Sequence, residues 1–90
     1  MNVEFDPEKA AANRRKHGIG FEDAASCLYD SSALAMEDVF AHGESRWILT
    51  GMSNKLQHLT VVYTLRSGRI RIIAARKAST REIRDYAQRI

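Results

Sequence analysis

Apolar and polar positions recur along this 90-residue chain with two periods, one typical of helices and one typical of strands. Within residues 21–29, four apolar residues lie at helical spacing and predict an amphipathic helix: Phe21, Ala24, Ala25 and Leu28. A first helix is expected over residues 7–17. Asp6-Pro7 suits its start, because Asp caps a helix and Pro fits the first turn, and Gly18 suits its end.

Four strands are expected in the rest of the chain, where apolar and polar residues alternate: Ala33–Glu37, Arg46–Met52, Leu59–Arg66 and Arg69–Arg76. Ser67-Gly68 predicts a two-residue hairpin between the last two strands. A closing helix is expected over residues 80–89, because Ser79 and Glu82 form a capping-box pattern. This order predicts a single α+β domain over residues 1–90, with two N-terminal helices, a four-stranded, mostly antiparallel sheet and a C-terminal helix.

Charge is segregated along the chain. Residues 66–90 carry eight basic and two acidic side chains, whereas residues 1–65 carry six basic and nine acidic ones. The net charge of +3 is therefore the balance between a C-terminal part at +6 and a remainder at −3. Such a basic segment favours an anionic partner, and a polyphosphate chain is the first candidate.

Cysteine and histidine usage argues against several classes of site. Cys27 is the single cysteine, so no intrachain disulfide is possible, and its place on an apolar helix side favours a buried structural thiol. The histidines, His17, His42 and His58, are not at metal-ligand spacing, so we expect no metal site and no cofactor. We find no signal-peptide pattern and no long apolar run. The expected location is therefore the cytoplasm, without membrane contact.

Six motifs are spread over nearly the whole chain: Phe5-Asp6-Pro7-Glu8-Lys9-Ala10-Ala11-Ala12-Asn13, Lys16-His17-Gly18, Phe21-Glu22-Asp23-Ala24, Arg46 to Gly51, Val61-Val62-Tyr63-Thr64 and Arg69-Ile70-Arg71-Ile72-Ile73-Ala74-Ala75-Arg76-Lys77-Ala78. At this spacing and in a chain this short, they resemble the BrnT family, the toxin half of a bacterial type II toxin–antitoxin pair. Family members often carry Ser where this chain has Ala74. That departure leaves the expected fold intact but removes one hydroxyl near the expected site.

The resemblance implies a RelE-like fold and a metal-independent endoribonuclease activity that cleaves RNA and inhibits translation. It also implies a cognate BrnA-like antitoxin, which binds the toxin directly, forms a heterotetramer with it and carries a ribbon-helix-helix DNA-binding domain. Operator DNA is then contacted only through the antitoxin, and the complex represses its own operon.

Arginines at strand ends are the candidates for stabilising charge in metal-free RNA cleavage, because a guanidinium matches phosphate oxygens with two parallel hydrogen bonds. The catalytic candidates of this kind are Arg76, Arg66 and Arg46. In a meander, Arg46 and Arg66 share one end of the sheet, and Arg76 lies at the other end with Lys55 and His58. Arg76 ranks first because it matches the family motif and follows the alternation Ile70, Ile72, Ala74. A strand-end arginine is also commonly an ion-paired surface residue. Arg69 and Arg71 suit either the solubility of their face or, with Arg66 and Arg76, contact with the antitoxin.

Proton transfer needs a different side chain. His42 and Glu44, in the loop before the second expected strand, are catalytic candidates, although Glu44 also suits an ion pair with Arg46 or Arg66. Further RNA-binding candidates are Lys16, His17, Lys77 and Tyr63. Trp47 and Tyr86 are expected to pack in the core.

A second interpretation stays open at this stage. The chain is then a small basic binding module that serves only as the partner and co-repressor of a DNA-binding antitoxin, without catalysis. Cleavage of RNA by the purified protein in EDTA separates the two interpretations.

Overall fold

The computed structural model describes residues 2–38 and 43–88, so the predicted candidate His42 lies outside the described residues. The helices are α1 (Pro7–His17), α2 (Phe21–Cys27) and α3 (Thr80–Ala87). The strands are β1 (Val3–Glu4), β2 (Leu34–Glu37), β3 (Arg46–Met52), β4 (His58–Arg66) and β5 (Arg69–Lys77). The expected α+β class is confirmed.

Local capping fixes the helix ends. The Asp6 carboxylate accepts the Glu8 N–H at 2.9 Å, and Gly18 ends α1 in the left-handed conformation at φ 73°. Ser79 and Glu82 form the predicted capping box at the start of α3. The prediction for α2 was two residues too long, because the N–H groups of Leu28 and Tyr29 bond three residues back and tighten the chain into a turn.

The sheet has five strands in the order β1-β5-β4-β3-β2, so the prediction of four strands was wrong. Strands β2 to β5 pair antiparallel, whereas β1 pairs parallel with β5 through Val3 and Glu4. A two-residue strand shows no alternation, and its pairing with residues 70–71 depends on a contact that spans most of the chain. The predicted hairpin turn is confirmed: Ser67 and Gly68 have φ 50° and 77°, the double positive φ of a type I′ turn.

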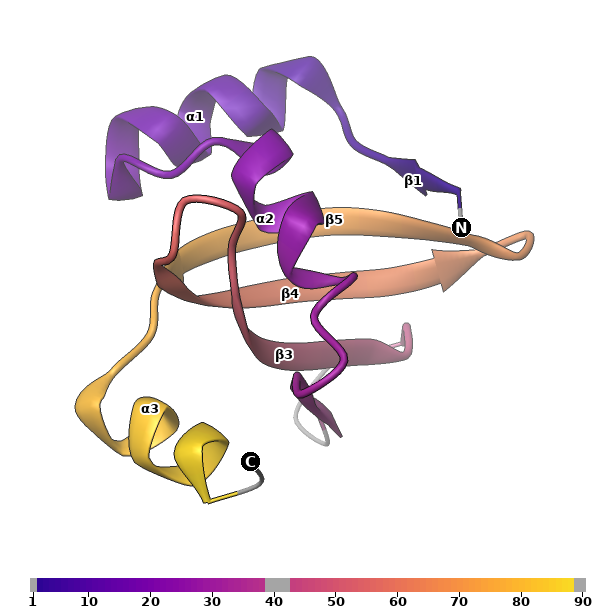
Figure 1. Ribbon diagram of the computed structural model, residues 1–90. Helices are drawn as coiled ribbons and strands as arrows, with labels where there is room; N and C mark the ends of the chain where they lie inside the picture. The colour runs from indigo at the N-terminus through magenta and orange to yellow at the C-terminus, as the bar shows by residue number, and fades with distance from the viewer. Residues whose placement is uncertain (1, 39–42, 89–90) are drawn as a thin grey trace.

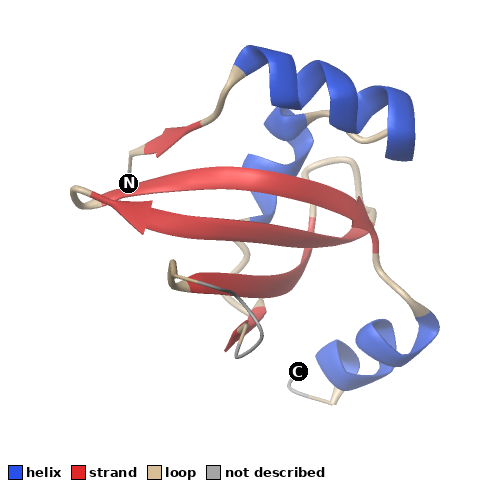
Figure 2. Ribbon diagram, turned by 180° about the vertical axis from the view of Figure 1, so that it is seen from behind, coloured by secondary structure: helices blue, strands red, loops and turns tan. Residues whose placement is uncertain are grey.

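Each helix contacts a different part of the sheet. Figures 1 and 2 show α2 crossing one face, α1 lying beside β5, and α3 at the end of the sheet where β5 finishes. The core lies between α2 and its face of the sheet: Ile19, Phe21, Ala24, Cys27, Leu49, Leu59, Val61, Ile72 and Ala75. Cys27 is buried there, as expected. Tyr86 is also buried as expected, but Trp47 is only half-buried and lies outside this core, so that prediction was wrong.

A β-bulge changes which face the end of β5 presents. Val62 pairs with Ala74 but the next residue, Tyr63, pairs with Ile72, so Ile73 is the extra residue. Side chains alternate along a strand, and the extra residue reverses the alternation. Arg76 therefore shares a face with Arg71 and not with Ile70 and Ile72, contrary to the sequence-based expectation.

Candidate functional site

The face of the sheet opposite α2 carries five arginines and is called the arginine face below. Directly paired residues share a face, and the register relates Arg46 to Thr64 and Thr64 to Arg71, while Arg76 is opposite Thr60. Alternate residues of a strand share a face, so Arg66, two residues from Thr64, and Arg69, two residues from Arg71, lie on the same face. The five arginines are Arg46 on β3, Arg66 on β4, and Arg69, Arg71 and Arg76 on β5.

One row of the arginine face brings two arginines together over a buried threonine. Arg46 and Arg71 stand on strands separated by β4, about 10 Å apart, which is within reach of two converging arginine side chains. Thr64, between them, is 1% exposed and its hydroxyl donates to the Ser45 carbonyl at 2.6 Å. The Nε of Arg46 is buried and has no hydrogen-bond partner in the described part of the chain. Such an unsatisfied donor calls for an acceptor.

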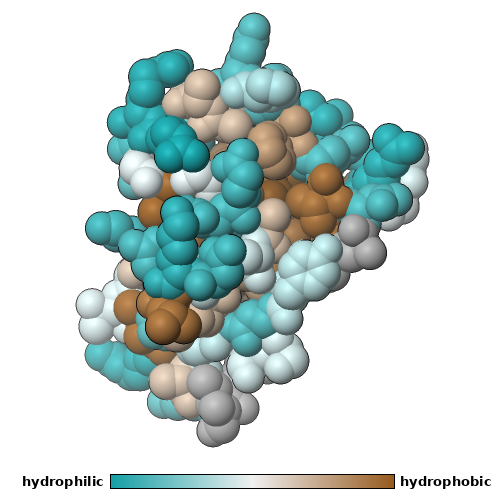
Figure 3. All heavy atoms as spheres, turned by 45° about the horizontal axis from the view of Figure 1, so that its top comes forward, coloured by the Kyte–Doolittle hydropathy of each residue, from teal (hydrophilic) through white to brown (hydrophobic). Residues whose placement is uncertain are grey.

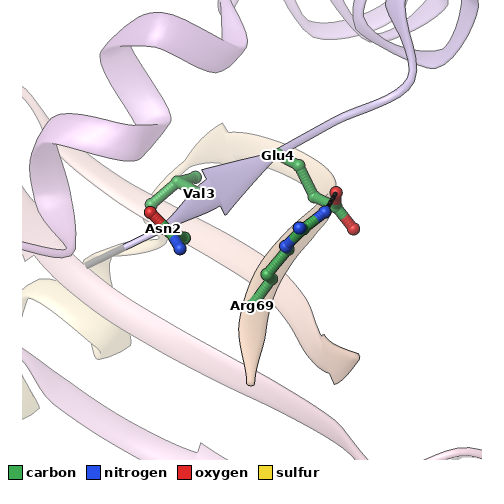
Figure 4. A pocket seen from close by; sticks show the side chains of 4 residues that line it. All are labelled: Asn2, Val3, Glu4 and Arg69. Atoms are coloured by element: carbon green, nitrogen blue, oxygen red, sulfur yellow. Dashed lines mark ion pairs between the residues drawn. The ribbon is translucent and has the colours of Figure 1, made fainter. Parts of the chain in front are cut away.

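Carboxylates accompany the arginines near the hairpin. Glu44 accepts from Nε and Nη2 of Arg66 at 3.2 and 3.1 Å, the pairing that the sequence suggested. Glu4 lies 3.5 Å from Arg71 and 3.8 Å from Arg69. Figure 4 shows the Glu4–Arg69 pair at the wall of an open hollow of about 440 Å³. These pairs are partly solvated and contribute little stability.

The other end of the arginine face is built around Arg76 and Glu82. Arg76 donates from Nη1 and Nη2 to the two Glu82 oxygens at 2.7 and 3.0 Å. Glu82 also accepts from the Thr60 hydroxyl at 2.9 Å and from the Ser79 N–H at 2.8 Å. The hydrogen bonds from the Arg76 guanidinium are the main cause that lowers the pKa of Glu82 to about 2. The same bonds raise the pKa of Arg76, so both groups are charged over the physiological range.

Arg76 keeps one edge of its guanidinium open. An arginine has five N–H donors. Two point at Glu82 and a third, on Nη1, donates to the Lys77 carbonyl at 3.3 Å. The Nε donor and one Nη2 donor remain without a partner among the described residues, and the side chain is 45% exposed. Glu82 therefore orients Arg76 while leaving an edge that can receive a second anion with two hydrogen bonds.

His58 stands beside Arg76 and was not among the site residues predicted from the sequence. It is two residues from Thr60, the partner of Arg76, so His58 and Arg76 are diagonal neighbours on one face, about 7–8 Å apart at Cα. Its half-buried ring lies edge-on to Tyr86, with centroids 5.3 Å apart. The meander predicted that His58 and Arg76 lie at the same end of the sheet, but only the alternation of β4 together with the bulge in β5 shows that they share a face.

The half-buried Asp30 and the buried Tyr86 form an acid–phenol pair behind His58. The Tyr86 hydroxyl donates to the Asp30 carboxylate at 2.7 Å, and the Met52 N–H donates to the same oxygen at 2.8 Å. The hydrogen bond to Asp30, followed by burial, raises the pKa of Tyr86 to about 12. For Asp30, burial opposes the charged form, but the bonds from Tyr86 and two backbone N–H groups lower the pKa. Tyr86 therefore stays protonated and holds α3 against the sheet.

The predicted residues lie on the arginine face, at a hollow beside α1, and on the face of the sheet that α2 covers. Arg46, Arg66 and Glu44 lie at the hairpin end of the arginine face, and Arg76 lies at the opposite end, as the meander required. Lys16 and His17 line a hollow between α1 and β5. Lys77, which pairs with Leu59, and Tyr63 share the face that α2 covers, where Tyr63 packs against the core and burial raises its pKa.

Two classes of feature are not found in residues 2–38 and 43–88. No group of three or more His, Cys, Asp or Glu side chains is arranged to hold a metal ion. Among the same residues, no helix has the length and apolarity to cross a membrane.

Comparisons with known proteins identify the family and agree with the fold. Residues 5–82 match the sequence model described as the ribonuclease toxin BrnT of type II toxin–antitoxin systems. The solved structure of the Brucella abortus ribonuclease toxin BrnT is 26% identical, with a TM-score of 0.66 over 89% of this chain and 99% of that chain. A search of curated proteins gave no match. The family match spans most of the chain and the fold agrees, so this chain belongs to the BrnT family of ribonuclease toxins of type II toxin–antitoxin systems.

Proposed function

We propose that this protein is a metal-independent endoribonuclease that cleaves RNA on the arginine face and thereby inhibits translation. The observation that carries the proposal is the bulge at Ile73, which turns Arg76 onto the face that holds the other four arginines. Bulges are frequent next to active sites, where they re-aim a side chain. An RNA strand lying along β4 meets guanidinium groups at both ends of that face.

Arg76 and His58 form the reacting centre in this proposal. The ribose 2′-oxygen attacks the adjacent phosphorus, an O2′–P bond forms and the P–O5′ bond breaks. The open edge of Arg76 receives the charge that develops on the phosphoryl oxygens, and Glu82 keeps that edge in place. His58 takes the proton of the attacking 2′-hydroxyl and gives a proton to the leaving 5′-oxygen. The guanidinium supplies the charge stabilisation that a metal ion provides in other nucleases.

The hairpin end of the arginine face binds the rest of the RNA strand. Thr60 and Thr64, which mark the rows of Arg76 and Arg71, are four residues apart, or about 13 Å. This distance exceeds the size of a single phosphate, so Arg46 and Arg71 contact a different phosphate from Arg76. Arg46 and Arg71 hold that phosphate from strands on either side of β4. Arg66 stays paired with Glu44 at the rim, and any part that Glu44 or His42 plays in proton transfer is secondary to that of His58.

The partner of the toxin is a BrnA-like antitoxin with a ribbon-helix-helix domain, in a heterotetramer that contacts operator DNA through the antitoxin and stays in the cytoplasm. An acidic antitoxin segment that covers the arginine face explains neutralisation, because it competes with RNA for the same charges. Replacing Arg66, Arg69, Arg71 and Arg76 with Gln is expected to weaken antitoxin binding and to flatten its salt dependence. Unchanged affinity and salt slope would place the antitoxin on another surface.

The test is cleavage of a labelled single-stranded RNA by purified protein in EDTA. We expect cleavage with 2′,3′-cyclic phosphate or 3′-phosphate ends, and its loss in Arg76→Gln and His58→Gln. Cleavage that disappears in EDTA and returns with magnesium or manganese contradicts the mechanism.

A specific observation favours the second candidate, a non-catalytic binding module. Four of the five arginines on the arginine face contact carboxylates of the same chain: Arg66, Arg69, Arg71 and Arg76. If RNA stays intact both with and without metal while the antitoxin binds tightly, this candidate replaces the first.

A further inference from the structure

A hollow of about 230 Å³ lies between α1 and the outer edge of β5, away from the Arg76 centre. Five residues of α1 and two of β5 line it: Lys9, Ala12, Asn13, Lys16, His17, Ile73 and Ala74. None of these residues is a carboxylate, so the lining is basic or neutral throughout.

The hollow exists because β5 has only partial neighbours on its outer side. β1 pairs with residues 70 and 71 and goes no further. At Ala75, the Asn13 side chain replaces a strand: its amide donates to the Ala75 carbonyl at 2.8 Å and accepts the Ala75 N–H at 3.1 Å. A second donation from Asn13, to the Ile19 carbonyl at 3.0 Å, ties the end of α1 to the same point. Between these two attachments, the bulged Ile73 and Ala74 face the hollow.

The basic side chains around the hollow are not neutralised. Lys9, Lys16 and His17 fall on one side of α1, at i, i+7 and i+8. Neither lysine forms an ion pair within the described residues, in contrast to the paired arginines across the sheet edge. Figure 3, with the α1 side turned forward, shows many hydrophilic side chains on this side of the molecule. The hollow therefore presents uncompensated positive charge.

The hollow is continuous with the arginine face through one residue. Ala74 lines it, and Ala74 also pairs with Val62 on the arginine face, two positions before Arg76. An RNA strand that leaves the Arg76 centre and crosses the edge of β5 enters the hollow directly. Lys9 and Lys16 are seven residues apart on the helix, about 10 Å, so they suit two different phosphates and not one.

We propose that this hollow is a second RNA subsite, which binds the phosphates of the strand beyond the cleaved bond through Lys9 and Lys16 and stacks a base on His17. Histidine rings stack on unpaired bases, and lysines bind phosphate as point charges. Single-stranded RNA fits better than an acidic peptide, because the lining offers no deep apolar pocket to anchor a peptide side chain. The inference rests on the proposed ribonuclease function and adds that the protein binds an RNA longer than the segment at the Arg76 centre.

The test compares two double variants of the full chain that each lose two positive charges from α1. Lys9→Gln/Lys16→Gln alters the hollow, and Arg14→Gln/Arg15→Gln is the matched control, since neither arginine lines it. Affinity for a 2′-O-methyl RNA is measured as a function of salt, with one oligonucleotide of about 12 nucleotides and one of about 4. For the longer RNA, we expect the lysine variant to lower the slope of log K against log salt by about 1.4, or 0.7 per lost phosphate contact.

We expect the control to retain the slope of the unmodified protein, and the shorter RNA to bind all three proteins alike. Equal loss in both double variants, or no loss in either, overturns the subsite. Normal RNA binding by the lysine variant combined with weaker antitoxin binding also overturns it, because the hollow is then a protein contact. If the unmodified protein binds neither RNA, the proposed function itself fails. If it binds and cleaves RNA and only the lysine effect is missing, the subsite alone fails.

Discussion

Replacing Glu82 with Gln removes one charge from the junction of α3 and the sheet while keeping the size of the side chain. The change removes the negative charge and replaces one of the two acceptor oxygens with an NH2 group, so Arg76 loses one of its two hydrogen bonds and the bonds from Thr60 and Ser79 weaken. Since Arg76 loses the group that orients it, we expect a lower free energy of unfolding and slower RNA cleavage together.

The expected loss of stability follows from the pKa of Glu82. A fall from 4.5 to about 2 corresponds to about 3 kcal/mol, since one pKa unit is 1.36 kcal/mol. Arg76 is 45% exposed, and solvent screening reduces the effect to about 1–2 kcal/mol. For a domain of this size, each kcal/mol lowers Tm by about 4–8 °C. Urea unfolding followed by circular dichroism measures the difference directly.

The contribution of Glu82 to the free energy of unfolding depends on pH, and the direction follows from its lowered pKa. A carboxylate whose folded pKa is depressed stabilises the protein fully above its unfolded pKa of 4.5, and this contribution is lost as pH falls toward about 2. The stability difference between the unmodified protein and Glu82→Gln is therefore constant above pH 5 and shrinks below it. Asp85→Asn, on an exposed position of α3, is the control and leaves stability unchanged. Equal stability of Glu82→Gln and the unmodified protein at pH 7 refutes this reasoning.

Three further predictions concern buried groups. Asn13→Ala leaves the Ala75 N–H and carbonyl without their partner and lowers the free energy of unfolding by about 2–4 kcal/mol in urea titrations. A change below about 0.5 kcal/mol contradicts the pairing of Asn13 with the edge of β5. Tyr86→Phe removes the bond to Asp30 and lowers the free energy of unfolding by about 1–2 kcal/mol. In the unmodified protein, the absorbance of Tyr86 titrates near pH 12, not near 10. Burial raises the pKa of Cys27 to about 12, so the thiol reacts with a disulfide reagent only upon unfolding, and rapid reaction of the folded protein contradicts its burial.

Local patterns were sufficient to predict most of the elements. The Asp6-Pro7 start, the Gly18 end, the Ser79–Glu82 box and the Ser67-Gly68 turn depend on short-range chemistry that the sequence displays, and each is present. The strand β1 was missed because two residues carry no period.

The site was less predictable than the elements. The bulge at Ile73 has no sequence signature, because it is a property of the pairing between β4 and β5. Without it, strict alternation places Arg76 on the wrong face, although the meander already places Arg76 and His58 at the same end of the sheet. The role of Glu82 also depends on tertiary structure, since a capping-box glutamate does not reveal that Arg76 approaches its other side.

Mapping where RNA binds tests the central claim most directly. The measurement is an NMR titration of the labelled protein with a single-stranded RNA whose 2′-hydroxyls are methylated, so that it binds without being cleaved. We predict shifts of the Arg46, Arg71 and Arg76 side-chain Nε–H signals and of the β3 to β5 amides. We expect small changes around Phe21 and Ala24 on the α2 side of the core. Shifts confined to the α2 side, with the arginine signals unmoved, would contradict the assignment of the arginine face as the RNA-cleaving surface.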